Sequence, residues 1–175
     1  KIDSVKIASG RAGNVIGGGD WSKDRLVPDI FKSFFEKKPI LIRNPDAIRP
    51  WQHVLEPLSG YLLLLENLYS KGDKFDEGWN FGPLDGDVKP VKVIVDYLIE
   101  KWGYEDSYIN DNSVQPNEAQ ILKLDISKAR NELGWEPNWD LFKALDNTIE
   151  WNKAFLNNED LRSLTIKQIH EFEGH

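Results

Sequence analysis

The sequence predicts a mostly helical α/β fold with a few short strands, and three observations support this prediction. Apolar residues recur at helical spacing in four stretches, 25–37, 57–69, 90–102 and 140–155. The alternation typical of strands is confined to short runs. Proline and glycine punctuate the helical stretches at their ends. An independent doubly wound domain needs more strands than this, so we expect a lobe that packs against another structural unit.

The expected elements follow one another in a simple order. We expect a strand at 3–8, a glycine-rich loop at 10–20, a helix at 25–37 and a strand at 39–43. An extended piece at 51–55, a helix at 57–69, a strand at 79–81 and a helix at 90–102 should follow. The rest is expected as irregular chain at 104–119, an extended piece at 121–124, a helix at 127–133 closed by Gly134 and a helix at 141–155 capped by Asp140. Weak helical character is expected at 164–172. The apolar stripes of the helices at 57–69, 90–102 and 140–155 are predicted to form the core.

The composition is that of an ordinary globular domain and excludes several classes of function. Of 175 residues, 40 % are hydrophobic and 11 % aromatic, which suffices for a packed core. A net charge of −7 argues against a nucleic-acid partner, because phosphate backbones need a basic surface. No run is long and apolar enough to span a membrane, and no signal peptide is evident. The absence of cysteine fits a reducing compartment, so we expect a cytoplasmic protein.

Methionine is absent as well, even at position 1, and for that reason we expect the chain to be part of a longer protein. We see no His or carboxylate spacing typical of a metal site.

Five segments carry a family resemblance. They are 11–17 (Arg-Ala-Gly-Asn-Val-Ile-Gly), 24–28 (Asp-Arg-Leu-Val-Pro), 48–54 (Ile-Arg-Pro-Trp-Gln-His-Val), 79–83 (Trp-Asn-Phe-Gly-Pro) and 124–137, which runs from Leu-Asp-Ile-Ser-Lys-Ala to Leu-Gly-Trp-Glu-Pro. In this order they resemble the second half of the extended short-chain dehydrogenase/reductase proteins that act on nucleotide sugars. Two variants, Gly-Gly-Gly-Asp-Trp at 17–21 and Asn-Pro-Asp-Ala-Ile-Arg-Pro-Trp-Gln-His at 44–53, resemble the branch that dehydrates CDP-glucose.

The resemblance implies the C-terminal substrate-binding lobe of such an enzyme, without the N-terminal Rossmann sheet. Residues 1–157 would form this lobe, with the last remnant of the Rossmann domain at 1–10, and 158–175 would be a polar tail. The implied ligand is a CDP-sugar, the implied cofactor of the longer enzyme is NAD, and the implied assembly is a homo-oligomer.

Asn14 is the first candidate contact. It lies between glycines, and its amide can donate to a phosphate or sugar oxygen and accept from a hydroxyl. The alternative is an asparagine that only holds a turn. In the resembling family this residue sits beside the sugar and the nicotinamide, so Asn14 and its neighbour Val15 are predicted on the cofactor side of the site. The glycines at 17–19 lack the Gly-Lys-Ser/Thr of a phosphate loop, and we interpret them as a flexible turn.

Two arginines are the candidate phosphate ligands. Arg25 opens a helix whose first N–H groups favour an anion, and Leu26 follows it in the predicted site. The alternative is a solvated surface arginine. Arg49 lies among apolar and aromatic neighbours, where its planar guanidinium suits a diphosphate. Its alternative is a structural ion pair with Glu56 or Asp46.

The remaining candidates form the other walls of the pocket. Trp51 follows the second arginine, and Asn80 lies at a strand exit, where it either borders the nucleotide or only fixes the loop. Gln115 occupies a place where many relatives carry a phosphate-binding arginine, which weakens that one contact. His53 is a lone histidine, which is more often structural than functional.

The catalytic residues that the resemblance requires are not found in the sequence. No Gly-x-Gly-x-x-Gly follows a strand, and the Tyr-x-x-x-Lys pattern occurs only at Tyr97–Lys101, inside an amphipathic helix. We therefore assign no catalytic residue and expect this chain alone to be inactive. Two alternatives stay open, namely part of an epimerase or dehydratase acting on a UDP- or dTDP-sugar, and a non-catalytic nucleotide-sugar-binding module.

Overall fold

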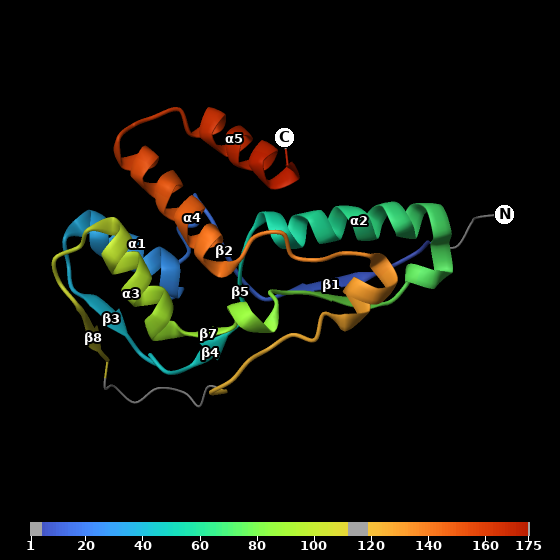
Figure 1. The fold of residues 1–175 in the computed structure, drawn as a ribbon, viewed down its shortest axis with the longest axis horizontal. Coiled ribbons are helices and arrows are strands. Elements are labelled where there is room, and N and C mark those ends of the chain that lie inside the picture. Colours follow the sequence, from blue (N-terminus) through green and yellow to red (C-terminus); the bar gives the residue numbers. More distant parts are fainter. Residues whose placement is uncertain (1–4, 112–118, 175) are drawn as a thin grey trace.

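The buried apolar side chains form two clusters, and the helices that carry them lie toward opposite ends of the molecule (Figure 1). The first fills the space between α1 (Leu26–Glu36), α3 (Val91–Trp102) and α4 (Leu141–Leu156), and we call it the three-helix core. The second lies between α2 (Leu55–Lys71) and β6 (Gly78–Phe81), and we call it the α2 core. Each fully buried leucine or isoleucine in such a cluster stabilises the fold by roughly 1.5–3 kcal/mol.

The computed structural model describes residues 5–111 and 119–174, and within them every sheet has two strands. The pairs are β1 (Ser9–Ala12) parallel to β6, β2 (Asn14–Ile16) parallel to β5 (Trp51–His53), β3 (Ile40–Ile42) parallel to β8 (Tyr108–Asn110), and β4 (Ile48–Arg49) antiparallel to β7 (Lys89–Pro90). Short helical turns are η1 (Gly72–Phe75), η2 (Asp85–Asp87) and η3 (Ala129–Leu133), and the last helix is α5 (Leu161–Glu173). The predicted fold class, mostly helical with short strands, is confirmed.

The segment 9–16 links the two clusters and corrects two predictions. The strand expected at 3–8 lies instead at Ser9–Ala12, and residues 1–4 are outside the described part. The loop expected at 10–20 contains β2 and most of β1. Parallel partners supply hydrogen bonds to this glycine-rich chain, with Gly10 opposite Trp79 in β6, so pairing overrides the local preference for a loop.

Helix ends follow the predicted local rules closely. Gly103 ends α3 in the left-handed region with φ of 78°, and its N–H donates to the carbonyls of Ile99 and Glu100. The Asp140 side chain accepts a hydrogen bond from the Lys143 N–H at the start of α4. The helices expected at 25–37, 90–102 and 141–155 are therefore confirmed.

The prediction for the α2 stripe was wrong about its burial. Of the five residues of the predicted stripe, Leu58, Leu62, Leu65 and Tyr69 are 46, 68, 59 and 95 % exposed, whereas Leu68 is partly buried and packs against the α2 core. The buried residues of this helix are instead Glu56, Pro57, Gly60, Leu64 and Asn67. The helix therefore turns its smaller and more polar face to the α2 core.

The glycines at 17–19 form a packed turn and not a flexible one. A Cβ on Gly18 would collide with the ring of Trp151 from α4, so only glycine allows this approach. Trp21 continues the contact with its ring centroid 4.8 Å from that of Phe155. The turn is thereby held against α4.

Two further segments are more regular than expected. The chain expected to be irregular at 104–119 contains β8, although residues 112–118 lie outside the described part. The segment of weak helical character is the 13-residue helix α5, whose buried Gln168 donates to the Asn147 carbonyl of α4 at 3.0 Å. None of the helices in the described residues is long and apolar enough to cross a membrane.

Candidate functional site

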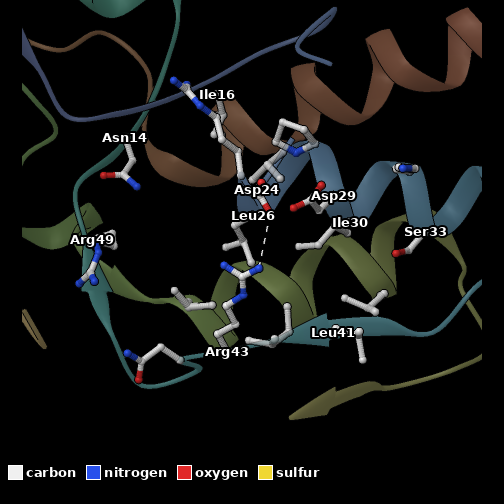
Figure 2. Close-up of a pocket in the computed structure, with 18 of the residues that line it drawn as sticks. Asn14, Ile16, Asp24, Leu26, Asp29, Ile30, Ser33, Leu41, Arg43 and Arg49 are labelled. Atoms are coloured by element: carbon white, nitrogen blue, oxygen red, sulfur yellow. Dashed lines mark hydrogen bonds and ion pairs between the residues drawn. The ribbon is translucent and has the colours of Figure 1, made fainter. Parts of the chain in front are cut away.

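A cavity of about 750 Å³ lies beside the start of α1, between β2, β3 and the β4–β5 segment (Figure 2). Six of the predicted contacts line it, although they come from three separate segments of the chain. They are Asn14, Val15, Arg25, Leu26, Arg49 and Trp51. The cavity is therefore the candidate site, and its walls are both polar and charged.

Asn14 is held at the cavity by the backbone around it. The N–H of Gly13 donates to the Phe81 carbonyl at 3.1 Å, and the N–H of Asn14 donates to the Pro50 carbonyl at 2.8 Å. A Cβ on Gly13 would collide with that Pro50 carbonyl, so glycine is needed at the corner between β1 and β2. The Asn14 side chain lies on the same side of the cavity as Arg49 (Figure 2).

Arg25 stands at the N-terminus of α1 in an extended conformation and makes no side-chain cap. Within the described residues its guanidinium makes no hydrogen bond or ion pair, so it is available to an anion. The N–H groups of Leu26 and Val27 begin the helix beside it, and the helix dipole adds to the attraction for negative charge.

Arg49 is half-buried and partly engaged by the backbone. Its Nη1 donates to the Ile48 carbonyl at 2.9 Å and to the Gln120 carbonyl at 3.4 Å. The two carboxylates considered as structural partners have other roles, because Asp46 pairs with Lys92 at 2.8 Å and Glu56 accepts from two backbone N–H groups. Backbone carbonyls thus orient this guanidinium at the cavity wall.

Trp51 lies directly opposite Asn14 in the parallel pairing of β2 and β5. It is buried, and its indole N–H has no hydrogen-bond partner in the described residues. The next residue, Gln52, donates to the Phe81 carbonyl at 2.8 Å, the same oxygen that accepts from Gly13. The buried strand β5 therefore supports the corner that carries Asn14.

The structure does not bring every predicted contact into this cavity. Asn80 donates to the Asp125 carbonyl at 3.0 Å and ties β6 to the segment before η3, as its loop-fixing alternative predicted. Gln115 lies outside the described residues. His53 is buried 5.0 Å from the ring of Trp139, and this burial lowers its pKa to about 4, so it stays neutral near pH 7.

Several charged residues of the cavity were missed by sequence reasoning. Asp24, Asp29, Lys32, Glu36 and Arg43 all line it. Arg43 reaches across to Asp24, with its Nη2 3.5 Å from the carboxylate (Figure 2). On α1 the polar residues 25, 29, 32 and 36 recur every three or four positions, and this helical spacing is the signal that could have revealed them.

Comparisons with known proteins identify the chain's relatives. No family model matches it. A CDP-glucose 4,6-dehydratase of Salmonella typhimurium is 52 % identical over 168 residues, covering 96 % of this chain and 47 % of that enzyme. The chain thus spans about half the length of the curated relative that it matches.

Solved structures share the fold over most of the chain. A UDP-glucuronic acid 4-epimerase from Bacillus cereus, in complex with UDP-glucuronic acid and NAD, has a TM-score of 0.74 at 23 % identity, covering 86 % of this chain and 46 % of that one. A dTDP-glucose 4,6-dehydratase from Bacillus anthracis, in complex with NAD, has a TM-score of 0.65 at 20 % identity, covering 83 % and 44 %. The family resemblance read from the five sequence segments is therefore confirmed: by sequence the chain is similar to about half of a CDP-glucose 4,6-dehydratase, and its fold is that of the matching part of nucleotide-sugar epimerases and dehydratases.

Proposed function

We propose that the chain is the sugar-nucleotide-binding part of an NAD-dependent dehydratase that converts CDP-glucose to CDP-4-keto-6-deoxyglucose in the cytoplasm. One observation carries the proposal beyond sequence similarity. Asn14, Arg25 and Arg49 come from three separate segments and yet line one cavity. Two cations and an amide around a common space are what a sugar diphosphate requires of a binding protein.

Each of these groups has a distinct role in the proposal. Arg25 and the first N–H groups of α1 attract the diphosphate, because both the side chain and the helix end carry positive charge there. Arg49 is oriented at the cavity wall by backbone carbonyls, and its positive charge attracts the same diphosphate. Asn14 is fixed at a backbone corner and suits the sugar hydroxyls, with which its amide can both donate and accept.

We assign the redox chemistry to residues outside this chain. In such an enzyme bound NAD supplies a reversible hydride acceptor, so that C4 of the glucose is oxidised, water is lost across C5 and C6, and the hydride returns to C6. The present sequence has no glycine-rich strand–turn–helix for a dinucleotide, so its residues do not form that site by themselves. Asn14 and Val15 are its proposed contacts on the cofactor side, and the part played by this chain is to bind and orient the sugar nucleotide.

Calorimetric titration of the 175-residue chain with CDP, UDP and dTDP tests the proposal. We expect binding of CDP in preference to the others. We expect Arg25→Ala to weaken it by roughly 10- to 100-fold, since a hydrogen bond to a charged group contributes about 1.5–3 kcal/mol. Arg130→Ala is the matched control, because Arg130 is also exposed but pairs with Glu136. Failure to bind any of the three nucleotides, or equal effects of the two substitutions, would contradict the proposal.

The same chain mixed with CDP-glucose and NAD is expected to form no 4-keto-6-deoxy product. Formation of that product by the pure chain would overturn the assignment of the chemistry to other residues. Equal affinity for UDP or dTDP would instead favour another nucleotide-sugar epimerase or dehydratase.

A further inference from the structure

The side of the cavity away from Asn14 carries charged groups that the proposed diphosphate contacts do not use. Asp24 and Asp29 lie near each other at the start of α1, and Arg43 extends toward them from the end of β3 (Figure 2). The negative charges of Asp24 and Asp29 offset the positive charges of Lys32 and Arg43, so this side lacks the excess of positive charge that would attract a diphosphate. This side therefore suits a different part of a nucleotide ligand, one that offers hydrogen-bond donors.

Asp29 is the carboxylate with no partner of its own. Asp24 pairs with Arg43, whereas within the described residues the Asp29 carboxylate makes no hydrogen bond or ion pair, and only the Asp29 backbone N–H donates, to the Arg25 carbonyl at 3.0 Å. Partial burial, together with the nearby charge of Asp24, raises the pKa of the Asp29 carboxyl above its usual value. The Asp29 residue is nevertheless exposed at the cavity wall, where its carboxylate oxygens can accept from a donor on a ligand.

Arg43 supplies the complementary groups close by. The positive charge of Lys32 and, less strongly, that of Arg43 act on Asp29 and lower its pKa. The 3.5 Å contact of Arg43 with Asp24 uses one terminal nitrogen of the guanidinium. The other N–H groups of an arginine remain available as donors. The wall thus places an acceptor, Asp29, near a set of donors, Arg43.

This order of acceptor and donor matches the edge of cytosine. Cytosine presents its N4 amino group as a donor next to the ring acceptors N3 and O2, and aspartate is a recognised acceptor for that amino group. Uracil and thymine present O4 in the place of the amino group, so a carboxylate there would face another acceptor. Resting on the proposed function, we propose that Asp29 is a specificity-determining residue that accepts the cytosine N4 amino group, with Arg43 donating to the neighbouring ring acceptors.

The inference requires the base to reach α1 while the diphosphate meets Arg25. Both Arg25 and Asp29 belong to one wall of the same cavity, one helical turn apart. The volume of about 750 Å³ lies within the range of pockets that enclose a nucleotide-sized ligand. Selection of the base and attraction of the diphosphate are thereby assigned to neighbouring residues of a single helix.

The test measures the ratio of CDP to UDP affinity for the chain and for Asp29→Asn. We expect the chain to favour CDP by about 10- to 100-fold, which is the usual discrimination from a good base contact. The asparagine amide can turn its NH₂ group toward O4 of uracil, so the ratio should fall about tenfold or more. Asp29→Glu retains the acceptor and should keep a preference for CDP.

Glu36→Gln is the matched control, because Glu36 lies on the same helix and lines the same cavity but pairs with Lys38 at 2.7 Å. Its CDP to UDP ratio should stay unchanged. If Asp29→Asn leaves the CDP to UDP affinity ratio unchanged, or if Glu36→Gln changes it equally, the inference about Asp29 is wrong. In either case, binding of CDP still supports the proposed function. Absence of binding by any nucleotide would overturn both. The melting temperature of each variant is measured as well, to check that the substitution leaves the fold intact.

Discussion

Helices α2 and α4 are alike in sequence pattern and opposite in burial. Both are long and amphipathic, with 17 and 16 residues. The apolar face of α4 packs into the three-helix core through residues such as Leu141 and Leu145, which are at most 1 % exposed. The leucine stripe of α2 is exposed, and Leu64 is the single leucine that this helix buries. The spacing of apolar residues in the sequence therefore identifies the apolar face of a helix, but it does not show whether another part of the protein packs on that face.

The buried side of α2 also differs in the kind of groups it contains. Among the described residues, the buried titratable side chains are His53, just before α2, and Glu56, in its first turn. The buried polar groups of α4 are the neutral Asn147, Thr148 and Asn152. Stability should therefore depend on pH through the buried groups at the start of α2, and on apolar packing through the three-helix core.

The largest expected effect compares one leucine from each helix. Leu145→Ala should lower the free energy of unfolding by roughly 2–5 kcal/mol, because it removes buried apolar contacts and leaves a cavity. Leu62→Ala, on the exposed stripe, should change it by less than about 0.5 kcal/mol. Urea unfolding of both variants measures the difference. Similar losses in the two variants would show that the α2 stripe is covered in solution.

A smaller effect concerns the pH dependence of stability that the buried His53 causes. The imidazole accepts a proton near pH 6.5 in the unfolded chain but only near pH 4 in the folded one, because burial disfavours its charged form. Its contribution to stability is therefore complete above pH 6.5 and is lost as the pH falls toward about 4. The loss amounts to roughly 3 kcal/mol at most.

Urea unfolding at about pH 7 and about pH 4, compared with the variant His53→Asn, isolates this contribution. The asparagine side chain can still accept from the Leu55 N–H, as His53 Nδ1 does at 3.4 Å. Burial raises the pKa of Glu56, so its stabilising effect decreases as the pH rises and opposes that of His53. The same pH dependence with and without His53 would contradict the prediction.

Substitutions in the exposed leucine stripe of α2 should have the smallest effect on the free energy of unfolding but a clear effect on self-association. Contiguous apolar residues on a surface favour association, so the chain should self-associate as its concentration rises. Leu62→Glu together with Leu65→Glu should abolish this association with little change in the free energy of unfolding. Analytical ultracentrifugation measures it, with Leu156→Glu at the end of α4 as the control. If all three proteins sediment alike, the stripe plays no part in association.

Local rules accounted for most of the elements, and the failures occur where distant segments meet. Gly103 and Asp140 act on the turn in which they lie, so the sequence suffices to predict them. The strand β1 depends on β6, which lies more than 60 residues further along the chain, and local alternation placed it at the wrong residues. The packed turn at Gly18 depends in the same way on Trp151.

For the candidate site, the sequence by itself determined which motifs carry Asn14, Arg25 and Arg49, because each depends on a short pattern of neighbouring residues. Only the tertiary structure decided that they line one cavity, that Asn80 fixes a loop, and that Asp29 and Arg43 face the same space. The physical reason is that a sequence motif depends only on the conformation of residues that are neighbours in the chain. Burial, charge pairing and the choice of the packed face of α2 arise from contacts between segments far apart in the chain.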